Sequence, residues 1–100
     1  MAVAVLWSDE AKRTFAANIE YLQTEWSEKE IRKFILRSEY VVSSLEEYPE
    51  LYSISNKHKK IRKATINKRI SLFYSYRPSK KMVMLLSFWN TYQDDKKRKF

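Results

Sequence analysis

The sequence contains no glycine and no cysteine, and it has one histidine and two prolines among its 100 residues. Loops that cradle phosphate with glycine are therefore excluded. Disulfides and thiolate zinc sites are excluded as well, which agrees with a protein of the reducing cytoplasm. A single histidine leaves little from which to build a metal cluster or a histidine-based catalytic triad. We therefore expect no metal and no cofactor.

A secretory signal and a membrane span are also missing from the pattern. The apolar run from Ala2 to Trp7 is too short to cross a bilayer, and it lacks the basic start and the cleavage site of a signal peptide. A length of 100 residues with 44% hydrophobic residues fits one folded domain over residues 1–100. We expect a soluble, cytoplasmic protein.

Positive charge is concentrated in the second half of the chain. Residues 1–56 hold 6 Lys or Arg and 10 Asp or Glu, a net charge of −4. Residues 57–100 hold 14 Lys or Arg and 2 Asp or Glu, a net charge of +12. A basic half joined to a mildly acidic half indicates an acidic or polyanionic partner, and a solubilising surface is the alternative.

The first half predicts a strand followed by two amphipathic helices. Val3 to Trp7 has no helical period, and Ser8 is placed to cap the helix that follows. A capping-box pattern at Ser27 begins the second helix, and Pro49 lies just beyond its end. Asn18 falls on the polar side of the first helix. The apolar stripes, which predict an antiparallel helical hairpin lying on a sheet, are Ala11, Phe15, Ile19, Leu22 and Trp26, then Ile31, Phe34, Ile35, Ser38, Val41, Val42 and Leu45.

The second half predicts three strands in sequence. They run over 57–66, 69–77 and 82–89, with turns at Asn67-Lys68, where Asn tolerates a positive φ, and at Pro78-Ser79. We interpret 49–56 as a loop and 96–100 as a frayed basic tail. The predicted fold is α+β: an antiparallel β-sheet with a two-helix hairpin packed on one face, in the order β-α-α-β-β-β.

This order of elements, with several local patterns, resembles the RelE/ParE superfamily of toxins from bacterial type II toxin–antitoxin systems. The matching pieces are VLWSDEAKRTFAANIEYLQTEWS, LEEYPEL, IRKATINKRISLFYSY and LLSFWNTYQDDKK, within roughly residues 3–97. The closing piece is similar to the Phe-aromatic-Asp-x-Arg-Gln-x-Pro-Lys-Lys ending of ParE-like members. It departs from that ending at Asn90, Tyr92 and Asp95, which stand for the acid, the arginine and the proline.

The resemblance implies a growth-arresting toxin that a cognate acidic antitoxin wraps and neutralises in a hetero-oligomer. RelE-like members cut messenger RNA on the ribosome, while ParE-like members inhibit DNA gyrase. Metal-free RNA cleavage requires a base, a cation for the phosphorane-like charge, and an acid. The positions similar to RelE-like catalytic residues are Lys60, Arg62, Arg69 and Tyr92. Pairing of the strands about the Asn67-Lys68 turn would place the three cations on one face, with Tyr92 at its edge.

Competing interpretations remain for the same residues. The lysines of 57–63 also fit a solvated edge strand, Tyr92 also fits packing on the helices, and His58 is expected to be exposed. No convincing general base is visible, so a non-enzymatic, ParE-like inhibitor is favoured, with a metal-free endoribonuclease as the alternative. A plain nucleic-acid-binding module ranks last. The residues expected to bind antitoxin or target are Lys59, Lys63, Trp89, Lys96 and Lys97.

Overall fold

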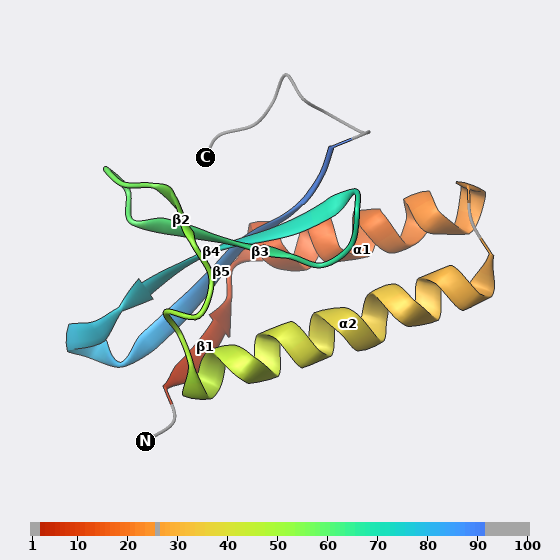
Figure 1. Ribbon diagram of the computed structural model, residues 1–100. Helices are drawn as coiled ribbons and strands as arrows, with labels where there is room; N and C mark the ends of the chain where they lie inside the picture. Colours follow the sequence, from red (N-terminus) through yellow and green to blue (C-terminus); the bar gives the residue numbers. More distant parts are fainter. Residues whose placement is uncertain (1–2, 26, 92–100) are drawn as a thin grey trace.

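The computed structural model describes residues 3–25 and 27–91. It confirms the α+β class, with two helices and a five-stranded sheet (Figure 1). Neither helix in this part of the chain has the length and hydrophobicity that a membrane span needs. The elements are β1 (Ala4–Trp7), α1 (Asp9–Glu25), α2 (Glu28–Glu47), β2 (Ile54–Asn56), β3 (Ile61–Thr65), β4 (Ile70–Arg77), the 3₁₀ helix η1 (Pro78–Lys80) and β5 (Met82–Asn90).

The sheet is mixed, which corrects the prediction of a purely antiparallel sheet. Its strand order is β1-β5-β4-β3-β2. The neighbours from β5 to β2 are antiparallel, but β1 runs parallel to β5, with Ala4 opposite Met82 and Trp7 opposite Leu85. Parallel pairing requires a crossover connection, and the helical hairpin is part of the long segment that provides it. The first strand therefore lies at the edge of the sheet, beside the last strand of the described residues.

The basic segment before β3 is mostly a turn, not a strand as predicted. Ile54–Asn56 forms the edge strand β2 instead of a loop, and Lys57 to Lys60 turn the chain back into β3. The Asn56 Oδ1 atom accepts a hydrogen bond from the Lys59 amide, and Lys60 has a φ of 54°. Buried positions begin only at Ile61, whereas Lys57 to Lys60 are all exposed. Consequently β3 is an inner strand and not a solvated edge.

The connection between β3 and β4 forms where predicted, but by a different mechanism. Asn67 does not have a positive φ. Its Oδ1 atom accepts hydrogen bonds from the amides of Arg69 and Ile70, at 2.8 and 2.9 Å. An asparagine side chain that bonds the backbone ahead of it imitates a turn. Ile66, just before it, is buried, so the connection covers residues 66–69 and is longer than a two-residue turn.

Both helices pack on one face of the sheet, as their stripes predict (Figure 1). Phe34 of α2 is buried, Phe15 of α1 is half-buried, and their rings stack 5.3 Å apart. Phe88 of β5 lies 5.1 Å from Phe15 and 5.5 Å from Trp7, ring centre to ring centre. The four aromatic rings fill the space between the helices and the sheet. The buried cluster consists of Ala11, Leu22, Phe34, Val41, Leu45, Ala64, Ile66, Ile70, Leu72, Tyr74, Val83, Leu85 and Phe88.

The two helix starts differ in their capping. The Ser8 Oγ atom accepts a hydrogen bond from the Ala11 amide at 3.0 Å, as expected of an N-cap serine. Ser27 holds the N-cap position of α2 with extended backbone angles, but its side chain forms no capping hydrogen bond. The capping-box pattern therefore marks the start of the second helix correctly without forming the box.

Side chains of α1 and of Ser8, the residue before it, form hydrogen bonds with the edge of β5 beyond the end of β1. Phe88 donates its amide to the Thr14 Oγ1 atom, and its carbonyl accepts from the Asn18 Nδ2 atom, both at 2.9 Å. Ser8 donates its hydroxyl to the Leu86 carbonyl at 3.2 Å. Asn18 is only 1% exposed, so its assignment to a solvent-facing side of the helix is wrong. Its polar groups are buried because the uncovered strand needs hydrogen-bond partners.

Candidate functional site

The sheet face that points away from the helices carries two of the predicted binding residues. Lys63 is exposed on β3 and lies opposite Phe73 of β4. Trp89 is half-buried on β5 and lies opposite Ser71. Leu72 and Tyr74 alternate with Ser71 and Phe73 along β4 and belong to the core beneath the helices. Because successive side chains of a strand point to opposite faces, Ser71 and Phe73 point away from the helices. Lys63 and Trp89 therefore share a face, separated by β4.

Arg62 points to the helix side and holds the loop that precedes β2. Its guanidinium donates to the Tyr52 carbonyl at 2.7 Å and to the Glu50 carbonyl at 3.2 Å. The Glu50 carboxylate lies 3.4 Å away, and the arginine side chain is only 17% exposed. Three acceptors from one loop occupy this guanidinium. The expectation that Arg62 shares a face with the other candidate cations is therefore wrong, because its place opposite Tyr74 directs it toward the helices.

Lys60 and Arg69 lie at opposite ends of the β3–β4 hairpin. Lys60 precedes the pair Ile61 and Ser75, while Arg69 follows the pair Thr65 and Ser71. Four residue steps of about 3.3 Å separate these two pairs, roughly 13 Å of strand. The structure therefore does not bring the three predicted cations together.

Arg69 is half-buried and lies against the end of β5. Its carbonyl accepts hydrogen bonds from the amide and the hydroxyl of Thr91, at 2.8 and 3.2 Å. Thr91 immediately precedes Tyr92 in the sequence. Tyr92, Lys96 and Lys97 lie outside the described residues. Arg69 is thus hydrogen-bonded to the residue that directly precedes the predicted tyrosine in the sequence.

Tyr74 is the described residue whose ionisation the fold changes clearly. It is fully buried, and its hydroxyl donates to the Pro49 carbonyl at 3.0 Å. Burial raises the pKa of Tyr74 to about 12, because the phenolate would lose its hydration. At neutral pH this tyrosine stays protonated and acts as a structural donor. In residues 3–25 and 27–91, no three His, Asp or Glu side chains are arranged to hold a metal ion.

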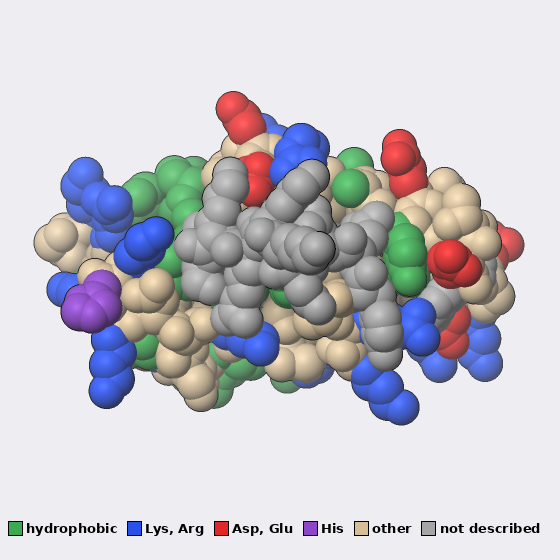
Figure 2. Space-filling model, turned by 90° about the horizontal axis from the view of Figure 1, so that it is seen from above, with side chains coloured by type: hydrophobic (Ala, Val, Ile, Leu, Met, Phe, Trp, Pro, Cys, Tyr) green, Lys and Arg blue, Asp and Glu red, His purple; other side chains and the backbone are tan. Residues whose placement is uncertain are grey.

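Two turns at one end of the sheet form a cavity of about 520 Å³, which we call the basic cleft. Lys59 and Lys60 come from the turn before β3, and Arg77 and Lys80 come from the end of β4 and from η1. Figure 2 shows Lys and Arg side chains gathered with the histidine at one end of the molecule, where no acidic side chain is visible in that view. The lining residues are Lys59, Lys60, Ile61, Ser75, Tyr76, Arg77, Pro78, Ser79, Lys80 and Leu86.

Sequence reasoning included Lys59 and Lys60 but missed Arg77 and Lys80. The predicted order of the strands already indicated that these residues lie near Lys59 and Lys60. In three consecutive antiparallel strands, the connection before the first strand and the connection after the second lie at the same end. Both connections are basic here, so their meeting follows from the strand order. The residues were missed because charge was assigned to strands and not to the turns between them.

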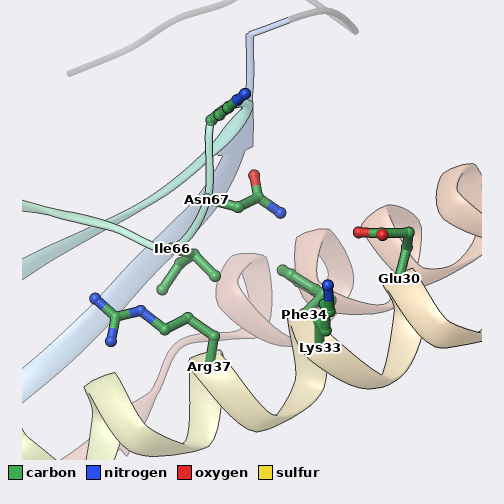
Figure 3. A pocket seen from close by; sticks show the side chains of 7 residues that line it. Glu30, Lys33, Phe34, Arg37, Ile66 and Asn67 are labelled. Carbon is green, nitrogen blue, oxygen red and sulfur yellow. The ribbon is translucent and has the colours of Figure 1, made fainter.

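A second hollow lies between α2 and the β3–β4 connection, and we call it the helix groove. It has a volume of about 400 Å³. Phe34 and Ile66 point toward the space between the two elements, as Figure 3 shows. The charged residues at this groove are Glu30, Lys33, Arg37 and Lys68. An apolar floor with a mostly cationic rim is suited to an acidic, partly apolar segment of a partner.

Comparison with known proteins shows a similarity in structure but none in sequence. No protein-family model and no curated protein matches the sequence. The chain is similar in structure to a chain of the toxin–antitoxin complex RelBE2 from Mycobacterium tuberculosis, with a TM-score of 0.60 and 12% identity. The match covers 90% of this chain and 99% of that one. The molecule therefore belongs to the α+β proteins with this hairpin-on-sheet layout. More particularly, it shares the fold of that chain of the RelBE2 complex, and this agrees with the fold that the resemblance in the sequence implies.

Proposed function

We propose that this chain is the toxin of a toxin–antitoxin pair and that it arrests growth without cleaving nucleic acid, by ParE-like inhibition of DNA gyrase. The observation that carries the mechanism is the engagement of Arg62. Its guanidinium is bound to Glu50 and Tyr52 on the helix side of the sheet. The toxin assignment is supported by the RelE-like fold, whose solved neighbour is part of a toxin–antitoxin complex.

The chemistry of RNA cleavage argues for the non-nucleolytic choice. A metal-free ribonuclease places a base, an acid and a charge-stabilising cation around one phosphate. Here Lys60 lies in an exposed turn, Arg62 faces the helices, and Arg69 lies at the far end of the hairpin. Roughly 13 Å of strand separates the two ends of the hairpin, so Lys60 and Arg69 are too far apart to contact the same phosphate. Binding of a protein target needs no such convergence.

The experiment that decides the target uses one preparation in two assays. Purified protein is added to DNA gyrase, with supercoiling as the readout, and to translating ribosomes, with messenger RNA fragments as the readout. We expect loss of supercoiling and intact messenger RNA. Tyr92→Phe should keep growth arrest, while charge reversal at Arg62 and Arg69 should weaken it through docking or fold. Fragments that disappear with Tyr92→Phe in a stably folded protein would overturn the proposal.

The endoribonuclease remains the second candidate because of one observation. Arg69 is hydrogen-bonded through its carbonyl to Thr91, the residue before Tyr92. A RelE-like reaction would draw on this end of the sheet, with Arg69 as the charge-stabilising cation and Tyr92 as the acid or base. The same two assays separate this candidate from a plain nucleic-acid-binding module, which would leave both supercoiling and messenger RNA unchanged.

The partner that follows from this function is an acidic antitoxin. We propose that a segment of it folds into the helix groove, with Phe34 and Ile66 as the apolar floor and Arg37 as a cationic contact. Another part is expected over Lys63 and Trp89 on the opposite face. Co-expression of a small acidic protein encoded beside the toxin should restore growth and raise the melting temperature, because binding to the native state stabilises it.

A matched pair of variants on α2 tests the groove. Arg37→Glu places a negative charge at its rim and should weaken antitoxin binding about tenfold. Arg32→Glu makes the same change on the same helix, outside the groove, where Arg32 lies 3.8 Å from Glu28. We expect its affinity to change less than twofold. Equal losses in both variants would remove the groove from the interface.

A further inference from the structure

The basic cleft is separate from the helix groove and lies at one end of the sheet, where Ile61 and Ser75 share the parity of Lys63 and the face that points away from the helices. It is assembled by two turns that are adjacent only in the folded sheet. Ile61 opposite Ser75 and Arg77 opposite Met82 fix the turns at the same end. The cavity of about 520 Å³ is lined by four cations and by the hydroxyl-bearing Ser75 and Ser79, with no Asp or Glu in the lining.

The four cations have no acidic partner in the part of the chain that the structure describes. The ion pairs there join Arg13 to Glu10, Arg32 to Glu28 and Arg62 to Glu50. Lys59, Lys60, Arg77 and Lys80 are all exposed, so water solvates their charges. Like charges gathered around one cavity repel each other, and an anion in the cavity would relieve that repulsion.

Two lysines at this end of the sheet have a strained backbone conformation. Lys60 and Lys81 are the described non-glycine residues with positive φ, at 54° and 48°. A left-handed conformation brings the Cβ atom of a side chain close to the following carbonyl oxygen and is therefore less favourable than the right-handed one. Glycine or asparagine would fit both positions with less strain. Both positions are lysines instead. Lys60 lines the cleft, and Lys81 directly follows the lining residue Lys80.

We propose that the basic cleft binds a phosphate group of a nucleic-acid backbone or of a free nucleotide. Arg77 supplies a planar guanidinium that suits two phosphate oxygens, and the lysines supply point charges around it. The hydroxyls of Ser75 and Ser79 can donate hydrogen bonds to the remaining oxygens. A phosphate group has more acceptor oxygens than a carboxylate, so it can engage more of these surrounding donors, which favours phosphate over an acidic side chain. The proposal is independent of the target of the toxin.

The test measures binding of the full chain to two phosphate probes. A fluorescent single-stranded oligonucleotide with hydroxyl ends reports binding of internal phosphodiesters, and ATP is the competitor. The cleft variant combines Lys60→Gly with Arg77→Gln. Glycine removes the charge and also relieves the backbone strain, so the variant should remain folded. The control variant combines Lys12→Gln with Arg32→Gln, which removes two exposed charges from the helices.

We expect the cleft variant to bind the probe at least about tenfold more weakly, and the control to change less than twofold. The slope of log K against log salt should fall by about one to two in the cleft variant only. Competition by ATP would assign the site to a nucleotide, and failure of ATP to compete would assign it to a nucleic-acid backbone. Absence of probe binding at low salt, equal losses in both variants, or preference for a polyglutamate peptide would overturn the proposal.

Discussion

The side-chain amide of Asn90, near the end of the last strand, donates a hydrogen bond of 3.1 Å to the side-chain oxygen of Asn18 in the first helix. Both residues are buried, at 4% and 1% exposure. The same Asn18 side chain donates to the Phe88 carbonyl and to the Thr14 carbonyl. One amide thus joins the helix to the strand beyond the reach of β1. These side chains of α1 form the hydrogen bonds with the backbone of β5 that a longer β1 would otherwise form.

Replacing Asn18 by alanine should therefore destabilise the protein. The Phe88 carbonyl would lose its side-chain donor in a buried place, and we expect the free energy of unfolding to fall by about 1–3 kcal/mol. Urea denaturation measures this loss. Gln23→Ala, an exposed change on the same helix, should stay within about 0.5 kcal/mol of the parent. Similar free energies of unfolding for the two variants would contradict the structural role of Asn18.

The aromatic cluster makes a second prediction about stability. Phe34→Ala removes a side chain that is 2% exposed and stacked on Phe15, so unfolding should become easier by about 3–5 kcal/mol. Leu36→Ala, two residues along the same helix and 59% exposed, should cost less than about 0.5 kcal/mol. A near-zero loss at Phe34 would show that the stripe does not carry the core.

Arg62 is predicted to act on stability through backbone acceptors. Arg62→Ala leaves the carbonyls of Glu50 and Tyr52 without the guanidinium, and we expect a loss of about 1–3 kcal/mol with faster proteolysis of the loop before β2. Glu50→Gln keeps both carbonyls and should cost less than about 0.5 kcal/mol, because its carboxylate is exposed. If Lys63→Ala on the opposite face proves as damaging as Arg62→Ala, the assignment of Arg62 to the loop fails.

Tyr74 links stability to alkaline pH. Its pKa is raised to about 12 in the folded protein from an ordinary value of 10, so the folded state holds this proton more tightly than the unfolded state. The resulting stability is fully present below pH 10 and is lost as the pH rises from 10 toward 12. Tyr74→Phe should therefore lose less stability than the parent over that range in urea titrations at stepped pH. Parallel curves for the two proteins would contradict the shift.

The helices were predictable because their information is local. A 3.6-residue period places Phe34, Val41 and Leu45 on one face whatever lies opposite, and those residues are buried. The β1–β5 pairing was not predictable in the same way, since it joins residues almost eighty positions apart. The turn at Lys57 to Lys60 was missed because neither glycine nor proline marks it.

The candidate site depended on details that a single sequence does not carry. The direction of Arg62 follows from the register that sets it opposite Tyr74, and a shift of one residue would have reversed it. Lys63 does lie on a strand, as its position in the basic segment predicts. The basic cleft required two turns to be considered together, although each was recognisable by its lysines.

The parallel pairing of the first and last strands also affects the order in which the chain acquires structure. Ala4 meets Met82, so β1 has no strand partner until nearly the whole described chain has left the ribosome. The meander of β3, β4 and β5 pairs strands that are neighbours in the sequence, whereas the β1–β5 pairing closes a much longer loop and therefore carries the largest loop entropy. During synthesis, Val5 and Trp7 thus wait without their sheet partner. A chain interrupted before β5 lacks Val83, Leu85 and Phe88 of the buried cluster, so such a fragment cannot form this core.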